Sequence, residues 1–174
     1  MRILHTESSK YSNESINRIS CENELIISEF PTQESFEKFL TKESFDCIFT
    51  RIGLEINKDI INTQNRLKYI VSPTTGLNHI DLVAASKKKI KIVSLKGETE
   101  FLNLVRSTAE HTWALLLSLI RNVNVASNDV KNGYWRRDPF VCEELDSKTI
   151  GIIGFGRLGK IIARYADAFF MNVL

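Results

Sequence analysis

Short apolar runs alternate with amphipathic segments along the first hundred residues. Runs rich in Ile, Leu, Val and Phe occupy residues 2–4, 25–27, 47–49, 67–71 and 90–93. Apolar positions recur at helical spacing over residues 34–40, 56–65 and 82–89, and Ile16 and Ile19 mark one helical face within the polar stretch 7–23. Because short apolar runs are typical of strands buried on both faces, this alternation predicts an α/β fold with a parallel sheet in a flavodoxin-like layer arrangement.

The stretch from Phe101 to Lys131 has a different pattern. It contains no Pro or Gly, it is rich in Leu, Ala and Val, and Gly133 follows it as a natural stop. We therefore predict one long helix that crosses between two domains or pairs with a second chain. Residues 1–100 are expected to form the first domain, 101–147 the crossing helix and a linker, and 148–174 the start of a second domain.

A glycine motif opens this second domain. Gly154, Gly156 and Gly159 have G-x-G-x-x-G spacing between an apolar run at 149–153 and a helical pattern at 160–169. In such a turn the first glycine permits the tight bend, the second admits a pyrophosphate to the backbone, and the third lets the helix pack closely on the strand. The context on both sides favours a dinucleotide-binding turn over a purely structural one.

The phosphate charge would be held by the free N–H groups and the dipole of the helix that follows. Arg157 either adds a cation beside the phosphate or points to solvent. The acidic residue that hydrogen-bonds the ribose in such sites usually ends the next strand. That strand would begin near Met171, and Leu174 is the last residue. The turn therefore predicts a dinucleotide cofactor, and the residues present leave NAD and NADP open.

Charge and cysteine content exclude several classes of protein. A formal net charge of +2 is too small to indicate nucleic acid or an anionic membrane as the main partner. No apolar stretch is long enough to span a bilayer, and the N-terminus lacks the apolar region of a signal peptide. Cys21, Cys47 and Cys142 are too widely spaced for a metal or dithiol motif, which is typical of free thiols in a reducing cytosol. We expect a cytoplasmic protein.

Four motifs, in order, carry a resemblance to a known family. They are Thr75–Leu82 (TGLNHIDL), Ser107–Thr112 (STAEHT), Gly133–Trp135 (GYW), and Glu144–Leu145 followed by Lys148–Gly159 (KTIGIIGFGRLG). With these the chain resembles the NAD-dependent D-isomer-specific 2-hydroxyacid dehydrogenases, and in particular their phosphoglycerate dehydrogenase-like members. The resemblance covers nearly the whole chain and is strongest from Lys68 onward.

The resemblance implies roles for particular residues. The flavodoxin-like domain would bind the substrate, and the segment from 148 would be the first strand and helix of an incomplete Rossmann domain. The backbone of Arg157 and Leu158 would lie on the cofactor pyrophosphate, as part of the turn from Gly154 to Gly159. Thr75 would lie beside the nicotinamide. The backbone of Thr75 and Gly76, with Arg51, would face the carboxylate or charged tail of a 2-hydroxy or 2-oxo acid. The helix at 101–131 would form a homodimer.

The sequence also departs from the family pattern. Ser94–Glu98 replaces an N-x-P-G segment, Ser147 replaces a glycine, and Phe170 stands where glycine commonly precedes Met. The family's catalytic Arg, Glu and His lie downstream of the glycine turn. We therefore expect a C-terminally truncated chain, without catalytic residues of its own and inactive alone.

The three histidines are expected to have structural roles or none, and the sequence supports three hypotheses of function. We expect His79 to serve the hydrogen bonds of its loop and His111 to act as a capping or interface residue, while His5 has no supporting context. The first hypothesis is an oxidoreductase that transfers a hydride between NAD(H) and a 2-hydroxy or 2-oxo acid. The alternatives are an NAD-sensing, corepressor-like interaction protein and a non-functional fragment.

Overall fold

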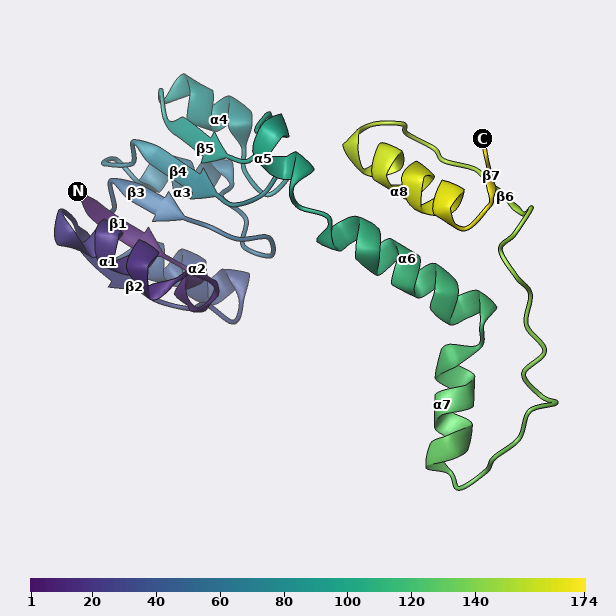
Figure 1. Ribbon diagram of the computed structural model, residues 1–174. Helices are drawn as coiled ribbons and strands as arrows, with labels where there is room; N and C mark the ends of the chain where they lie inside the picture. The colour runs from purple at the N-terminus through teal and green to yellow at the C-terminus, as the bar shows by residue number, and fades with distance from the viewer. The chain divides into compact units, whose positions relative to one another are not determined.

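The structure, a computed structural model, describes residues 1–174 apart from the side chain of Lys10. The chain divides into two compact units, Met1–Glu98 and Thr99–Leu174, which are described separately (Figure 1).

A five-stranded parallel sheet forms the centre of the first unit. Its strands are β1 (Arg2–His5), β2 (Glu24–Ile27), β3 (Cys47–Phe49), β4 (Tyr69–Ser72) and β5 (Lys91–Ser94). Their order across the sheet is β2-β1-β3-β4-β5, and every neighbouring pair is parallel. This is the flavodoxin-like order, so the predicted α/β fold is confirmed.

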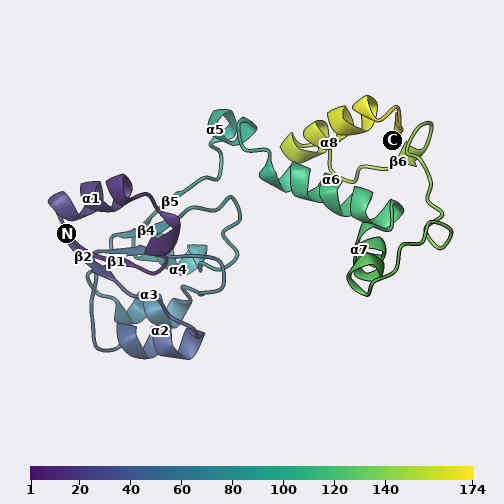
Figure 2. The same cartoon turned by 60° about the horizontal axis from the view of Figure 1, so that its bottom comes forward.

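Helices connect the strands and cover both faces of the sheet. They are α1 (Asn13–Cys21), α2 (Gln33–Leu40), α3 (Lys58–Thr63) and α4 (Leu82–Lys87), with a short 3₁₀ turn η1 (Ser8–Lys10) after β1. Figure 2 shows α1 on one face and α2 and α3 on the other. Each of the four α-helices begins at a side chain that accepts the N–H three residues later, and these capping residues are Ser12, Thr32, Asn57 and Asp81.

The core of this unit is apolar, with one buried polar side chain that joins three backbone segments. Leu4, Phe36 and Ile48 have no exposed surface, as expected for positions between the sheet and its helices. Gln64 is only 1% exposed. Its amide nitrogen donates to the carbonyl oxygens of Leu40 at 2.7 Å and Glu43 at 2.9 Å, and its Oε1 accepts the N–H of Phe45 at 3.1 Å. These bonds hold the connection between α2 and β3.

The second unit is mostly helical and contains one β-α-β segment. Its elements are α5 (Thr99–Asn103), α6 (Ser107–Ile120), α7 (Val123–Lys131), β6 (Thr149–Ile150), α8 (Arg157–Ala168) and β7 (Asn172–Val173). β6 and β7 pair in parallel, as the first strands of a Rossmann domain do. Trp113 of α6 packs against the rings of Tyr165 and Phe169, with centroids 5.9 Å and 5.2 Å apart.

The prediction of one helix over 101–131 was wrong, because the stretch forms three helices. Asn122 separates α6 from α7 with a φ of 51°, a left-handed conformation that asparagine tolerates better than most residues. Its side-chain nitrogen lies 3.5 Å from the carbonyl oxygen of Val141. Between α5 and α6, the carbonyl oxygens of Leu102 and Val105 accept hydrogen bonds from Arg157, and that of Leu102 also accepts the backbone N–H of Val105 at 3.1 Å.

Two features are absent from the part of the chain that the structure describes. No helix there has the length and apolar character needed to cross a membrane. No three His, Cys, Asp or Glu side chains gather there in a way that would hold a metal ion.

Candidate substrate and cofactor sites

The glycine turn lies between β6 and α8, where a strand gives way to a helix. Gly154 has a φ of +98°, a backbone conformation that side chains with a Cβ rarely adopt. Gly156 is the N-terminal cap of α8, and the backbone N–H of Lys160 donates to its carbonyl oxygen at 3.0 Å to close the first helical turn. The three glycines therefore stand at the bend, at the cap and inside the first turn.

Gly156 and Gly159 lack side chains for different reasons. A Cβ at Gly156 would meet no atom within 4 Å, so its surroundings are open. A Cβ at Gly159 would lie closer than 3.0 Å to the carbonyl oxygen of Gly154 and 3.2 Å from Cγ2 of Ile152. Gly159 thus permits the helix to approach the turn, while Gly156 leaves the backbone accessible to a ligand.

The N-terminus of α8 suits an anion. Gly156 provides no side-chain cap. Among the described residues, the first turn of the helix contains no acidic side chain. The first N–H groups of a helix have no partner within it, and the helix dipole adds partial positive charge at this end. A turn with these properties fits the pyrophosphate of a dinucleotide.

The side chain of Arg157 is engaged elsewhere. Its Nη1 donates to the carbonyl oxygen of Leu102 at 2.8 Å and to that of Val105 at 2.9 Å. The sequence left two alternatives for this side chain, a place beside the phosphate or in solvent. The structure shows neither of them. The side chain instead ties α8 to the connection between α5 and α6, and only the backbone of Arg157 remains for a cofactor.

The predicted substrate residues follow two neighbouring strands of the first unit. Arg51 comes after β3, where its Nη2 donates to the carbonyl oxygen of Phe30 at 3.2 Å and its Nη1 lies 3.4 Å from that of Ile52. Thr75 and Gly76 lie in the exposed loop after β4. Since β3 and β4 are parallel and adjacent, these residues lie at the same edge of the sheet. Ligands of open α/β sheets bind at this edge.

A chain of hydrogen bonds shapes the loop that carries Thr75 and Gly76. Thr74 Oγ1 donates to the carbonyl oxygen of Gly76 at 2.7 Å, and Ser72 Oγ lies 2.8 Å from Thr74 Oγ1 and 3.0 Å from His79 Nε2. Because a carbonyl oxygen only accepts, Thr74 must accept from Ser72, and Ser72 must accept from a protonated Nε2 of His79. Burial lowers the pKa of the His79 imidazole below its ordinary value. His79 therefore serves this loop as a neutral donor, as expected from the sequence.

A cavity of about 310 Å³ lies beside Arg51. Thr6 and Glu7 follow β1, and Glu29 and Phe30 follow β2, so that strand ends supply its wall. Sequence reasoning missed both glutamates, although Glu7 comes three residues and Glu29 two residues after a predicted apolar run. That placement, just beyond the carboxyl end of a parallel strand, is the signal that identifies such residues.

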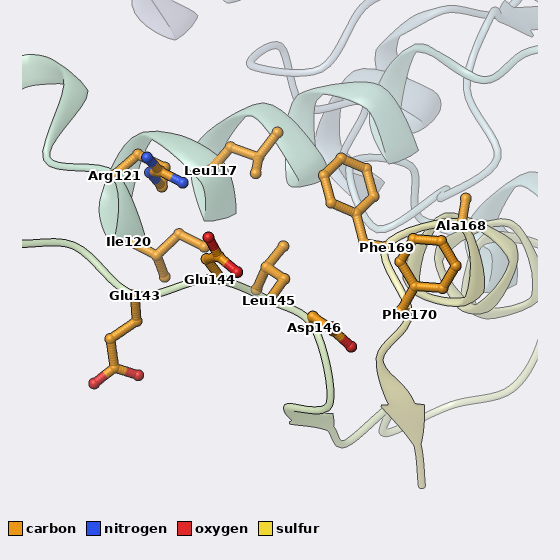
Figure 3. Close-up of a pocket in the computed structure, with 10 residues that line it drawn as sticks. All are labelled: Leu117, Ile120, Arg121, Glu143, Glu144, Leu145, Asp146, Ala168, Phe169 and Phe170. Carbon is orange, nitrogen blue, oxygen red and sulfur yellow. The ribbon is translucent and has the colours of Figure 1, made fainter.

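A second hollow, of about 290 Å³, lies in the second unit (Figure 3). In Figure 3 the lining residues Leu117, Ile120 and Leu145 lie to one side of the hollow, and Phe169 and Phe170 lie to the other. The two phenylalanines follow the last turn of α8, so this hollow is about 18 Å from the glycine turn along a twelve-residue helix. It is separate from the candidate cofactor turn, and its lining also includes Arg121, Glu143, Glu144 and Asp146.

Comparisons with known proteins agree with this geometry. The family model for the NAD-binding domain of D-isomer specific 2-hydroxyacid dehydrogenases matches residues 113–174. D-3-phosphoglycerate dehydrogenase of Bacillus subtilis is 35% identical over 130 residues, which cover 75% of this chain and 24% of the relative. Glyoxylate reductase of Pyrococcus furiosus is 32% identical over 167 residues, or 91% of this chain and 48% of the relative. The chain belongs to the D-isomer-specific 2-hydroxyacid dehydrogenase family.

Solved structures extend the likeness to the fold. A D-lactate dehydrogenase from Aquifex aeolicus, complexed with NAD and lactic acid, has a TM-score of 0.74 at 26% identity. The match covers 99% of this chain and 50% of that structure. The chain thus spans between about a quarter and a half of the length of the dehydrogenases it matches.

Both departures from the dehydrogenase glycine pattern have a conformational consequence. Ser147 and Phe170 adopt left-handed backbone conformations, with φ values of 60° and 58°. The backbone N–H of Ser147 donates to the carbonyl oxygen of Phe170 at 2.9 Å, so the two residues are joined just before β6 and β7. Glycine adopts this conformation without a steric penalty, which explains the glycines expected at these positions.

Proposed function

We propose that this chain supplies the substrate domain and the start of the cofactor domain of an oxidoreductase that transfers a hydride between NAD(H) and a 2-hydroxy or 2-oxo acid. The observation that carries the proposal is the glycine turn, with its positive φ at Gly154, its open backbone at Gly156 and its close contact at Gly159. The bound nicotinamide would supply the hydride chemistry. The residues of this chain would bind the cofactor and the substrate and orient them toward each other.

Each predicted site residue has a role in this proposal. The backbone of the turn from Gly154 to Gly159, including Arg157 and Leu158, holds the pyrophosphate. Thr75 lies beside the nicotinamide, and the backbone of Thr75 and Gly76 faces the substrate. Arg51 holds the substrate carboxylate, for which the planar fork of a guanidinium is suited.

Turnover is not expected from this chain by itself. Proton transfer to the reacting oxygen requires an accessible acid or base within hydrogen-bond reach. Of the two histidines in the first unit, His5 is 1% exposed and the Nε2 of His79 is already bonded to Ser72, so neither is free to exchange a proton with a substrate. The proposal is therefore tested by cofactor binding, and we expect a dissociation constant for NAD that is roughly millimolar.

The decisive experiment compares two alanine variants of the glycine turn. Gly156→Ala places a methyl group in open space at a φ of −83°, so it should abolish NAD-induced shifts of the amide resonances of residues 154–159 and leave the thermal midpoint unchanged. Gly159→Ala drives a methyl group into a backbone oxygen and should lower the midpoint. Undiminished NAD shifts in Gly156→Ala would contradict the proposed site.

We also propose that the helices of 101–131 pair with a second copy of the chain. Leu115, Leu119 and Val125 are all more than half exposed on α6 and α7, and Leu119 is 75% exposed. Burying such side chains between two copies would remove them from water. Leu119→Glu should convert a dimer to a monomer in sedimentation analysis, whereas the control Val83→Glu, at an exposed valine of α4, should not. A monomeric wild-type chain at high concentration refutes this assembly.

A reducing, cytoplasmic location completes the proposal. The three cysteines are free thiols. Burial, with a smaller contribution from the charge of Asp46, raises the pKa of the Cys47 thiol to about 12. Such a thiol stays protonated and unreactive, which suits a structural residue in a reducing compartment.

A further inference from the structure

The cavity beside Arg51 lies where the connections of the sheet diverge. β1 stands between β2 and β3 in the strand order. The chain leaves β1 toward β2, and it leaves β3 in the opposite direction toward β4. Such a switch point opens a crevice at the carboxyl ends of the strands, where ligands of open α/β folds bind.

The charges that line this cavity do not neutralise one another. Among the described residues, its charged side chains are Glu7, Glu29 and Arg51. Within that same set, no carboxylate lies within 4.0 Å of Arg51, and neither glutamate forms an ion pair. The guanidinium can take an anionic group, and the two carboxylates can take a cationic one. The described side chains that line the cavity carry a net charge of minus one.

In the described part of the chain, one buried polar group without a partner lines this cavity, and two more belong to residues that immediately precede lining residues in the chain. Thr6, which lines the cavity, is 1% exposed, and Thr50, which precedes Arg51, is 2% exposed. The side-chain hydroxyls of both residues lack a hydrogen-bond partner among the residues described, as does Nε2 of His5 at the end of β1. Buried polar atoms are nearly always hydrogen-bonded, and exceptions mark sites that a ligand or water completes. The unpartnered hydroxyl of Thr6 and the unpaired charges thus indicate the same small-molecule site.

We propose that the acid bound by this chain carries a cationic group at the far end of its side chain, which Glu7 and Glu29 hold while Arg51 holds the carboxylate. This inference rests on the proposed function and narrows its substrate class. A second anionic group, such as a phosphate, would lie against two carboxylates and is disfavoured. The acid therefore differs from phosphoglycerate, the compound in the name of several relatives.

Three acids of equal length measure this preference. They are 6-amino-2-hydroxyhexanoate, with a cationic end, 2-hydroxyhexanoate, with a neutral end, and 2-hydroxyadipate, with an anionic end. Charge interactions near a protein surface are modest, so we expect roughly tenfold tighter binding of the cationic acid than of the neutral one. The anionic acid should bind more weakly than the neutral one, and added salt should reduce both differences.

The experiment titrates the ¹⁵N-labelled full chain with each acid and follows the amide resonances of residues 5–9 and 50–53. In the double variant Glu7→Gln/Glu29→Gln, affinity for the neutral acid should persist and the preference for the cationic acid should disappear. Glu22→Gln, which removes an exposed carboxylate at the end of α1, is the matched control and should keep that preference.

Two results overturn the inference while leaving the proposed function intact. One is equal or tighter binding of the anionic acid, and the other is a cationic preference that survives in the double variant. A third result would refute the proposed function together with the charge preference. If none of the three acids shifts these resonances at roughly ten millimolar, the proposed substrate class itself is refuted, and the preference with it.

Discussion

Replacing Ser147 with glycine should stabilise the second unit. Ser147 has a φ of 60°, and its side chain is exposed, with Oγ donating a hydrogen bond to Oδ1 of the neighbouring Asp146 at 3.0 Å. The backbone hydrogen bond from its N–H to the carbonyl oxygen of Phe170 does not depend on the side chain. Glycine would therefore keep the fold and remove the steric conflict.

The expected gain is the difference between two effects of similar size. A residue with a Cβ costs about 1–2 kcal/mol in the left-handed region relative to glycine. Glycine in turn makes the unfolded chain more flexible, which offsets about 0.5–1 kcal/mol. The exposed hydrogen bond contributes little. The net stabilisation is about 0.5–1 kcal/mol, which raises the thermal midpoint of a unit of this size by roughly 2–8 °C.

The fluorescence of Trp113 reports this unfolding transition, because that side chain is 7% exposed in the core of the unit. Trp135, which is 92% exposed, is replaced by Phe throughout to remove its background. Ser147→Ala is the control, since it removes the hydroxyl but keeps the steric conflict, and its midpoint should stay level or fall. A lower midpoint for Ser147→Gly, or an equal rise for Ser147→Ala, refutes the reasoning.

Three further predictions concern buried or bonded polar groups. Gln64→Leu leaves three backbone groups without their partner and should lower the free energy of unfolding of the first unit by about 3 kcal/mol in urea melts; a loss below 1 kcal/mol contradicts this. Arg157→Gln should speed hydrogen exchange at residues 102–106 without weakening NAD binding, and unchanged exchange would show that its two carbonyl contacts are dispensable. His79 has a pKa below 6.5 in the folded chain, so the unfolded chain binds its proton first, and stability should fall as the pH drops below about 6.5. Urea midpoints at pH 7.5 and 5.5 measure this, and His79→Gln should remove part of the difference; an unaltered difference rules His79 out as its source.

The strands of the first unit could be predicted from the sequence because they are buried on both faces. Each predicted run lies within two residues of an observed strand, and the run at 47–49 coincides with β3. A parallel strand between two helical layers requires apolar residues at successive positions, so the pattern itself locates it. The strand order, by contrast, depends on which strands pair, and no local pattern carries that information.

Tertiary contacts explain what the sequence did not predict. The absence of Pro and Gly between Phe101 and Lys131 indicated an unbroken helix, yet the breaks at Leu104–Arg106 and Asn122 are stabilised by partners more than fifteen residues away. Glu7 and Glu29 resemble ordinary solvated loop residues in the sequence. Only the adjacency of β1, β2 and β3 places them beside Arg51.

The second and third glycines of the motif, Gly156 and Gly159, are under different selective pressures. A side chain at Gly156 meets open space, so a lineage that no longer needs a dinucleotide can replace this glycine at no structural penalty. A side chain at Gly159 meets the backbone of Gly154, so this glycine is retained as long as the helix packs on the strand. In a set of related chains, the residue at 156 therefore reports whether the cofactor is still used. The residue at 159 reports only that the domain still folds.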